Sequence, residues 1–251
     1  MDGLRHSMTN LLDGHERLSN ELSASVAESI GDAPLRSQLA AGLDAPAPAH
    51  SALVAESLAH IFGTSTVAVV HYGSHAHCAD ARPESAPDFF VIVSDYLAAY
   101  RSLAATVGTH YRPSVAASLN RVLAPNVVAV GTPAVVCDRA THQSSQRAVR
   151  AKCAIFSWRD FRRACIAPRD HFVQGRLAQL AQLTWARDDA SRAAVADAIV
   201  DLRARSFERN RVRLPQRFDA RAYCRALIHT SFAVEIRPER PERIDALLAA
   251  Q

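Results

Sequence analysis

Two runs of β-branched and aromatic residues in the first half of the chain have the length of strands. They occupy residues 66–72 (Thr-Val-Ala-Val-Val-His-Tyr) and 88–93 (Asp-Phe-Phe-Val-Ile-Val). Glycine, proline and serine, which favour turns, lie between the two runs. The pattern therefore predicts two buried strands that flank a polar loop.

Apolar residues at helical spacing lie on both sides of these strands. Residues 1–62 predict helices that an Ala-Pro linker at 45–48 interrupts, and from residue 158 onward nearly every segment predicts helix, including 172–185. The segments between predict helices at 97–107 and 113–123 and strands at 126–130, 134–137 and 149–156. This order predicts an α+β or α/β sheet domain at residues 1–157, followed by a helical domain at 158–251.

The composition excludes several classes of protein. The chain has 251 residues, of which 49% are hydrophobic and 22% charged, so a disordered chain is excluded and one large or two modest domains are expected. The longest uncharged apolar stretch, residues 122–137, is shorter than a bilayer span and contains two prolines, so no membrane-spanning helix is expected. Charged residues interrupt the first 20 positions, which disfavours a secretory signal or a transit peptide. The predicted location is therefore cytoplasmic.

Cysteine and histidine spacing does not favour a zinc site. The five cysteines are odd in number and form no Cys-x-x-Cys pair, so we expect small core residues without disulfides. His71, His75 and His77 alternate at the end of the first predicted strand. Histidines at a strand end are more often hydrogen-bonded structural groups than metal ligands, and that is the expectation here.

Basic residues are concentrated in one segment. Residues 139–176 contain nine basic and two acidic residues, while the formal charge of the whole chain is only +4. This segment is expected to attract anions. It includes Lys152, the one lysine among 29 basic residues. A nucleic-acid partner is not expected, because aromatic residues make up only 6% of the chain and acidic residues are interleaved with the arginines after residue 201.

The residues with the clearest chemical meaning lie at the two facing ends of the first two strands. The first strand ends in Tyr72-Gly73-Ser74 and the second opens with Asp88. A Gly-Ser turn offers backbone N–H groups and a hydroxyl to a phosphate without a bulky Cβ in the way. A carboxylate on the next strand can then hold Mg²⁺ against that phosphate. The alternative is an ordinary turn followed by a strand-start residue that faces water.

This combination resembles the nucleotidyltransferase superfamily, whose signature is a strand, Gly-Ser and an Asp-x-Asp on the following strand. A narrower resemblance, to the mitochondrial-type phosphatidate cytidylyltransferases (the translocator assembly and maintenance family), covers most of the chain beyond residue 66. Its motifs are similar to Tyr72-Gly73-Ser74, Ala86-Pro87-Asp88-Phe89, His110-Tyr111, 123–126, Lys152, Trp158, 173–177, 214–215 and 231–237. The chain departs from the family at His75-Ala76, Phe232 and Glu235.

The resemblance implies an α+β fold, with a nucleotidyltransferase-like mixed sheet followed by a mostly helical, winged-helix-like domain. The implied reaction moves a cytidylyl group from CTP to phosphatidic acid and releases pyrophosphate. Asp88 would hold Mg²⁺, and Lys152 would stabilise the charge that develops on the leaving group. The nucleotide-binding set would be Tyr72, Gly73, Ser74, Lys152 and Arg176. The resemblance also favours Glu235 and Arg237 for the wall of the active site.

Each of these roles has a simpler alternative. Lys152 can be an exposed strand lysine, Arg176 a solvated charge beside a helical glycine, and Glu235 with Arg237 a surface ion pair. The second magnesium carboxylate is open among Asp80, Glu84, Asp138 and Glu235. Apolar residues at 244–248 next to arginines predict weak, transient contact with a membrane surface.

Two other functions stay open. The same chemistry can serve another acceptor, or the chain can be a nucleotide-binding regulatory protein that has lost turnover. The second reading is motivated by Ala86, which stands where the superfamily has its first Asp, and by the unassigned second metal ligand.

Overall fold

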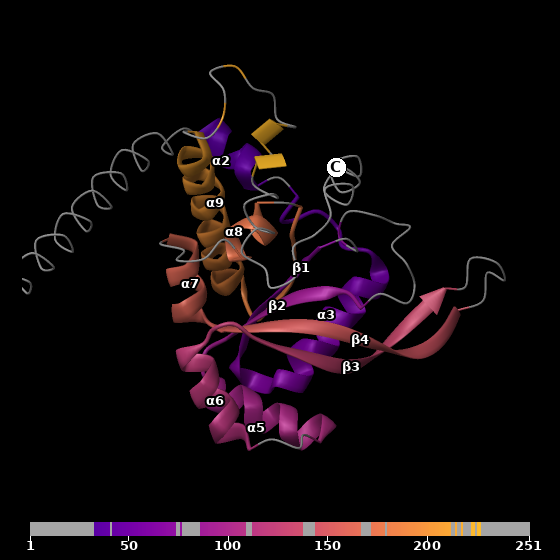
Figure 1. Cartoon of the computed structure of the whole chain (residues 1–251). Helices are drawn as coiled ribbons and strands as arrows, with labels where there is room; N and C mark the ends of the chain where they lie inside the picture. The colour runs from indigo at the N-terminus through magenta and orange to yellow at the C-terminus, as the bar shows by residue number, and fades with distance from the viewer. Residues whose placement is uncertain are drawn as a thin grey trace, which may run out of the picture. The chain divides into compact units, whose positions relative to one another are not determined.

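A computed structural model gives the fold (Figure 1). It describes residues 33–40, 42–73, 76, 86–108, 112–137, 144–166, 172–178, 180–211, 214, 217, 222–223 and 225–226. The chain divides into two compact units, 1–39 and 40–251. The first unit holds nearly all of helix α2 (Ala33–Ala40), and the sheet and the remaining described helices belong to the second.

The second unit is built on a five-stranded mixed sheet with the order β3-β4-β2-β1-β5. The pair β2–β4 is parallel, whereas β1–β2, β1–β5 and β3–β4 are antiparallel. The strands are β1 (Thr66–Tyr72), β2 (Asp88–Val93), β3 (Asn126–Cys137), β4 (Ser144–Ser157) and β5 (Gln182–Ala186). The chain thus combines helices with a mixed sheet, as the α+β prediction states.

The helices begin and end where the local sequence favours it. Asp95 caps helix α5 by accepting a hydrogen bond from the Ala98 N–H at 2.8 Å, and Pro113 occupies the first turn of α6, where its missing N–H costs nothing. The helices of this unit are α3 (Ala49–Phe62), the 3₁₀ turn η1 (Gly63–Ser65), α5 (Tyr96–Val107), α6 (Pro113–Val122), α7 (Trp158–Ile166), α8 (Phe172–Leu177) and α9 (Asp189–Arg211).

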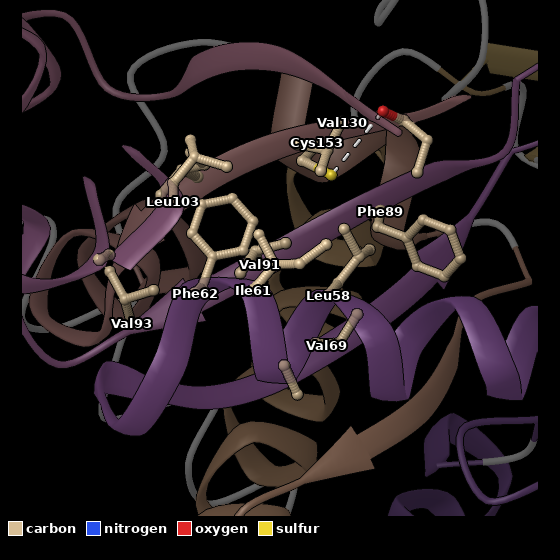
Figure 2. Packing of buried hydrophobic residues seen from close by; sticks show 14 of the residues in the cluster. Leu58, Ile61, Phe62, Val69, Phe89, Val91, Val93, Leu103, Val130 and Cys153 are labelled. Atoms are coloured by element: carbon tan, nitrogen blue, oxygen red, sulfur yellow. Dashed lines mark hydrogen bonds between the residues drawn. The ribbon is translucent and has the colours of Figure 1, made fainter. Parts of the chain in front are cut away.

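One face of the sheet packs on α3 and α5 and forms the main core. Leu58, Ile61 and Phe62 of α3 form one buried cluster with Val69 and Phe89 of the central strands (Figure 2). All five side chains are no more than 5% exposed. Because side chains alternate along a strand, this face, the α3 face, takes every second residue of β1, β2 and β4.

The opposite face carries Tyr72, Phe90 and Phe156, and we call it the aromatic face. Tyr72 stacks on Phe90 with ring centroids 4.2 Å apart, and Phe156 lies 5.7 Å from Phe90. Phe161 of α7 and Phe172 of α8 approach Phe90 edge-on, at 6.4 and 6.1 Å. Edge-on and offset arrangements are favourable between aromatic rings, so these contacts hold α7 and α8 against the sheet.

The structure differs from the predicted elements in two places. Residues 126–137 form one continuous strand, and its hairpin partner β4 starts five residues before the predicted 149. The segment 172–185, predicted as one helix, is the short helix α8 followed by β5, which pairs with β1. The helical spacing there was misleading because the free edge of β1 offers backbone hydrogen bonds to a short strand. The predicted helices before residue 33 lie outside the described residues, and the domain boundary near 157 stays a prediction.

Candidate functional site

Strand register brings three predicted site residues into one row across the sheet. Asp88, the first residue of β2, pairs with Tyr72 of β1 on one side and with Lys152 of β4 on the other. The backbone N–H of Lys152 donates to the Pro87 carbonyl at 2.9 Å, which fixes the parallel register at this point. Paired residues on neighbouring strands project from the same face, so all three side chains belong to the aromatic face.

The turn after β1 meets the Asp88 carboxylate. Gly73 has a φ of +85°, a left-handed conformation that residues with a Cβ rarely adopt. A Cβ added at Gly73 would lie 3.0 Å from Asp88 Oδ2 and 3.5 Å from Asp88 Cβ. Glycine at this position therefore leaves room beside a carboxylate oxygen. Ser74, the other member of the predicted turn, lies outside the described residues.

The exposure of the row suits binding of a charged ligand. Tyr72 is buried under its stacking partner Phe90, Asp88 is partly exposed, and Lys152 is exposed. Among the residues that the structure describes, Lys152 makes no ion pair. Its ammonium group is therefore accessible at the same end of the sheet as the Asp88 carboxylate.

Arg176 reaches the same face from helix α8. Its guanidinium carbon lies 5.7 Å from the centre of the Phe172 ring, within the range of a cation–π contact. Phe172 in turn packs edge-on against Phe90, which is two residues from Asp88 on the same face of β2. Arg176 is therefore held on the aromatic face, where Phe172 lies between its guanidinium group and Phe90.

Two residues next to the row, Cys153 and His71, have side chains on the α3 face and are packed in the core. Cys153 follows Lys152 and is fully buried, and burial together with the negative charge of Asp88 raises the pKa of its thiol. His71 is buried too, stacks on Phe89 at 4.9 Å between centroids, and lies 3.4 Å from the Gln182 side chain. The expectation that cysteines serve as core residues is met by Cys153 and by Cys165, which is also buried.

Several predicted site residues cannot be compared with the structure. Those outside the described residues are Ser74, His75, His77, Asp80, Glu84, Asp138, Glu235, Arg237 and the segment 244–248. Within the described residues, no group of three or more His, Cys, Asp or Glu side chains forms a metal cluster. Asp88 fits a magnesium ligand in two respects. Its carboxylate is a partly exposed oxygen donor, and Gly73 leaves open the space beside Oδ2 that a Cβ at that position would fill.

Sequence reasoning missed one basic residue beside the row. Arg150 precedes Lys152 by two positions on β4, so it projects from the same face, and it is exposed. The signal was present in the alternation of basic and small residues from 150 to 153, within a segment that the sequence predicts as a strand. The sequence does not show that this strand lies beside β2.

No family model matches this chain, and no curated protein matches it either. None of the helices within the described residues combines the length and the apolar character needed to cross a bilayer.

Proposed function

We propose that this chain is a magnesium-dependent nucleotidyltransferase that moves CMP from CTP to phosphatidic acid and releases pyrophosphate. The observation that carries the proposal is the row of Tyr72, Asp88 and Lys152 on one face of the sheet, with the turn at Gly73 next to the Asp88 carboxylate. A phosphate-binding turn, a carboxylate for a hard cation and an accessible ammonium group are what transfer of a nucleotidyl group requires. The finer fold, a nucleotidyltransferase-like sheet with a helical, winged-helix-like second domain, is part of the same proposal.

In this mechanism the chain positions charged groups and supplies countercharge. Asp88 would hold Mg²⁺, which when bound neutralises triphosphate oxygens. The left-handed turn at Gly73 lets backbone N–H groups approach a terminal phosphate closely. A phosphate oxygen of the acceptor attacks the α-phosphorus, and the bond from that phosphorus to the bridging oxygen of the β-phosphate breaks. Lys152 is placed to stabilise the negative charge that develops on the departing pyrophosphate.

The acceptor needs no strong general base. A phosphate monoester is already ionised near neutral pH, since its second pKa is about 6. This agrees with a row that contains one carboxylate and one amine, and with a neighbouring thiol, Cys153, that is buried on the other face. Arg176, held over Phe172, would add positive charge on the nucleotide side.

A second candidate function is nucleotide binding without turnover. Ala86, which is described and only partly buried, stands two residues before Asp88, where a second carboxylate would complete a metal pair. A chain with one metal carboxylate could bind a nucleotide and regulate a partner. Transfer to another acceptor is the remaining variant of the first function. If the acceptor is a lipid, we further propose that the protein is cytoplasmic and contacts the membrane surface transiently.

The test offers radiolabelled CTP, UTP, ATP and GTP with phosphatidate vesicles, with and without Mg²⁺. Lipid-linked CMP formed only from CTP and Mg²⁺ supports the proposal. Label transferred to a different acceptor supports the variant, and tight nucleotide binding without pyrophosphate release supports the regulatory function.

A matched pair of substitutions assigns the activity to the row. Asp88→Asn should abolish transfer and leave thermal unfolding nearly unchanged. Asp189→Asn is the control, because Asp189 is an exposed carboxylate at the first position of α9. This helix follows the end of β5 that pairs with Ala68, near the start of β1 and away from Tyr72. Retained transfer in Asp88→Asn would remove Asp88 from the mechanism. Lys152→Gln should chiefly lower kcat, and an unchanged kcat would leave Lys152 with a structural role only.

A further inference from the structure

Part of the aromatic face is exposed beside the row. On β3, Ala129 pairs with Lys152 and Gly131 pairs with Arg150, so all four residues project from the face that carries Asp88. All four are exposed, and Val127, which precedes them on the same side of β3, is 56% exposed. We call Val127, Ala129, Gly131, Arg150 and Lys152 the β3–β4 platform. The rings that cover Phe90 on β2 come from α7 and α8 and lie over the neighbouring part of the face.

The platform carries two basic side chains, Arg150 and Lys152. Arg150 and Lys152 are two residues apart on one strand face, so their Cα atoms lie about 7 Å from each other. Within the described part of the chain neither side chain forms an ion pair. Lys152 lies across the β2–β4 pair from the Asp88 carboxylate, whereas Arg150 is paired with Gly131 and has no acid opposite it on β3. A bound phosphate would therefore supply countercharge to Arg150.

The rest of the platform is apolar and has room above it. A Cβ added at Gly131 would meet nothing within 4 Å, and the residues beside the cations, Ala129 and Val127, have only hydrocarbon side chains. A ligand that suits both parts has a doubly charged phosphate at one end and an apolar body at the other. A phosphate group matches arginine especially well, because the guanidinium donates two parallel hydrogen bonds to its oxygens.

We propose that Arg150 binds the phosphate of the acceptor, and that the acceptor is a lipid phosphate monoester whose apolar part lies over Ala129 and Val127. This assignment rests on the proposed transferase function and names a residue for its second substrate. Lys152 lies between Arg150 and Asp88, so a phosphate bound by Arg150 would lie next to the residues proposed to hold Mg²⁺ and the nucleotide. Arg150 then sets affinity for the acceptor, whereas Asp88 and the Gly73 turn set affinity for the nucleotide.

Vesicle binding tests the charge requirement without any turnover. The full-length chain is sedimented with phosphatidylcholine vesicles that contain phosphatidate, or phosphatidylserine at the same net charge. Arg150→Gln should weaken binding to the phosphatidate vesicles about five- to tenfold. Arg101→Gln, which removes an exposed arginine of α5, should change binding less than twofold. Equal losses in the two variants, or equal losses on both vesicle types, would show general attraction to anionic surfaces and overturn the proposal.

The apolar part is tested at Gly131. Gly131→Phe places a ring over the platform and should lower binding to phosphatidate vesicles at least fivefold while thermal unfolding stays unchanged. Leu119→Phe, which adds a ring at an exposed position of α6 outside the platform, should leave both unchanged. Glycerol 3-phosphate serves as the soluble competitor. If it binds as tightly as the lipid, or if Gly131→Phe binds lipid normally, the platform holds no lipid chain and the proposal is wrong.

Kinetics separate this proposal from the transferase function. If the chain transfers CMP, Arg150→Gln should raise KM for the lipid about tenfold and leave KM for CTP unchanged. An unchanged KM for the lipid overturns the role of Arg150 while the transferase function stands. If no nucleotide is transferred but Arg150→Gln still loses selective binding to phosphatidate, the transferase function fails and the lipid phosphate site stands.

Discussion

The close approach of Gly73 to Asp88 predicts a specific cost for Gly73→Ala. At a φ of +85° an alanine is strained by about 1–2 kcal/mol, because its Cβ crowds the following carbonyl. The same Cβ would lie 3.0 Å from Asp88 Oδ2, closer than such atoms normally approach, so the carboxylate must move by a few tenths of an ångström. For a chain of this size, the backbone strain alone corresponds to a fall in Tm of roughly 2–8 °C.

A double-mutant cycle separates the two contributions. In an Asp88→Ala background the Oδ2 atom is gone, and the nearest remaining contact is Asp88 Cβ at 3.5 Å, an ordinary separation. Gly73→Ala should then cost only the backbone strain, so the two substitutions should be coupled by at least about 0.5 kcal/mol in urea denaturation. Additive free energies would mean that the turn and the carboxylate are independent.

Gly131→Ala provides the matched control for the same substitution. Gly131 lies on strand β3, a Cβ there meets nothing within 4 Å, and its φ is not in the left-handed region. We expect Gly131→Ala to raise the urea midpoint slightly, because alanine at a compatible φ stabilises by about 0.4–1 kcal/mol through the unfolded chain, whereas Gly73→Ala lowers both the midpoint and the affinity for nucleotide with Mg²⁺. Equal midpoints for the two variants would refute the left-handed turn and its contact with Asp88.

Two further predictions concern the core. Asn120 is fully buried, accepts a hydrogen bond from the Tyr100 hydroxyl at 2.9 Å and donates one to the Ile155 carbonyl at 3.0 Å. In urea denaturation, Asn120→Ala should therefore lower the unfolding free energy by about 2–4 kcal/mol and Tyr100→Phe by about 1 kcal/mol. Equal losses in the two variants would contradict this network. Burial raises the pKa of the Cys153 and Cys165 thiols from 9.0, so they stay protonated in the native state while unfolded thiols ionise. Their stabilisation is complete below pH 9, and above it the unfolding free energy should fall by up to about 1.4 kcal/mol per pH unit per thiol. The double alanine variant should show a shallower fall in urea denaturation between pH 9 and 10, and an identical slope would contradict the prediction.

The central strands could be predicted from the sequence, whereas the edge of the sheet could not. Residues 66–72 and 88–93 are strands with the predicted bounds, because continuous β-branched runs between turn residues have few other stable conformations. β5 is only five residues long and continues from a segment with helical spacing. Its conformation depends on the unpaired edge of β1, a tertiary partner that local sequence does not reveal.

Asp88 and Lys152 could be predicted as candidate site residues, but their common face could not be predicted. β1 is buried along its whole length, and β2 along all of it except Asp88. Strands that are apolar on both sides have no alternation from which a face can be assigned. The sequence therefore predicted Asp88 and Lys152 as chemical groups without predicting that they pair. Arg150 was missed because the sequence does not show that β4 pairs with β2 next to Asp88.

The register that assembles the row is determined by ring packing more than by polarity. A slip of one residue between β1 and β2 would still bury apolar side chains on both faces, so the hydrophobic effect alone discriminates weakly between registers. It would, however, break the stacking of Tyr72 on Phe90 and of His71 on Phe89, which lie on opposite faces of the same two strands. It would also turn Asp88 toward the α3 face, where a charge without water or partners is costly. The aromatic pairs and the carboxylate thus favour one register, and that register joins the turn, the acid and the lysine.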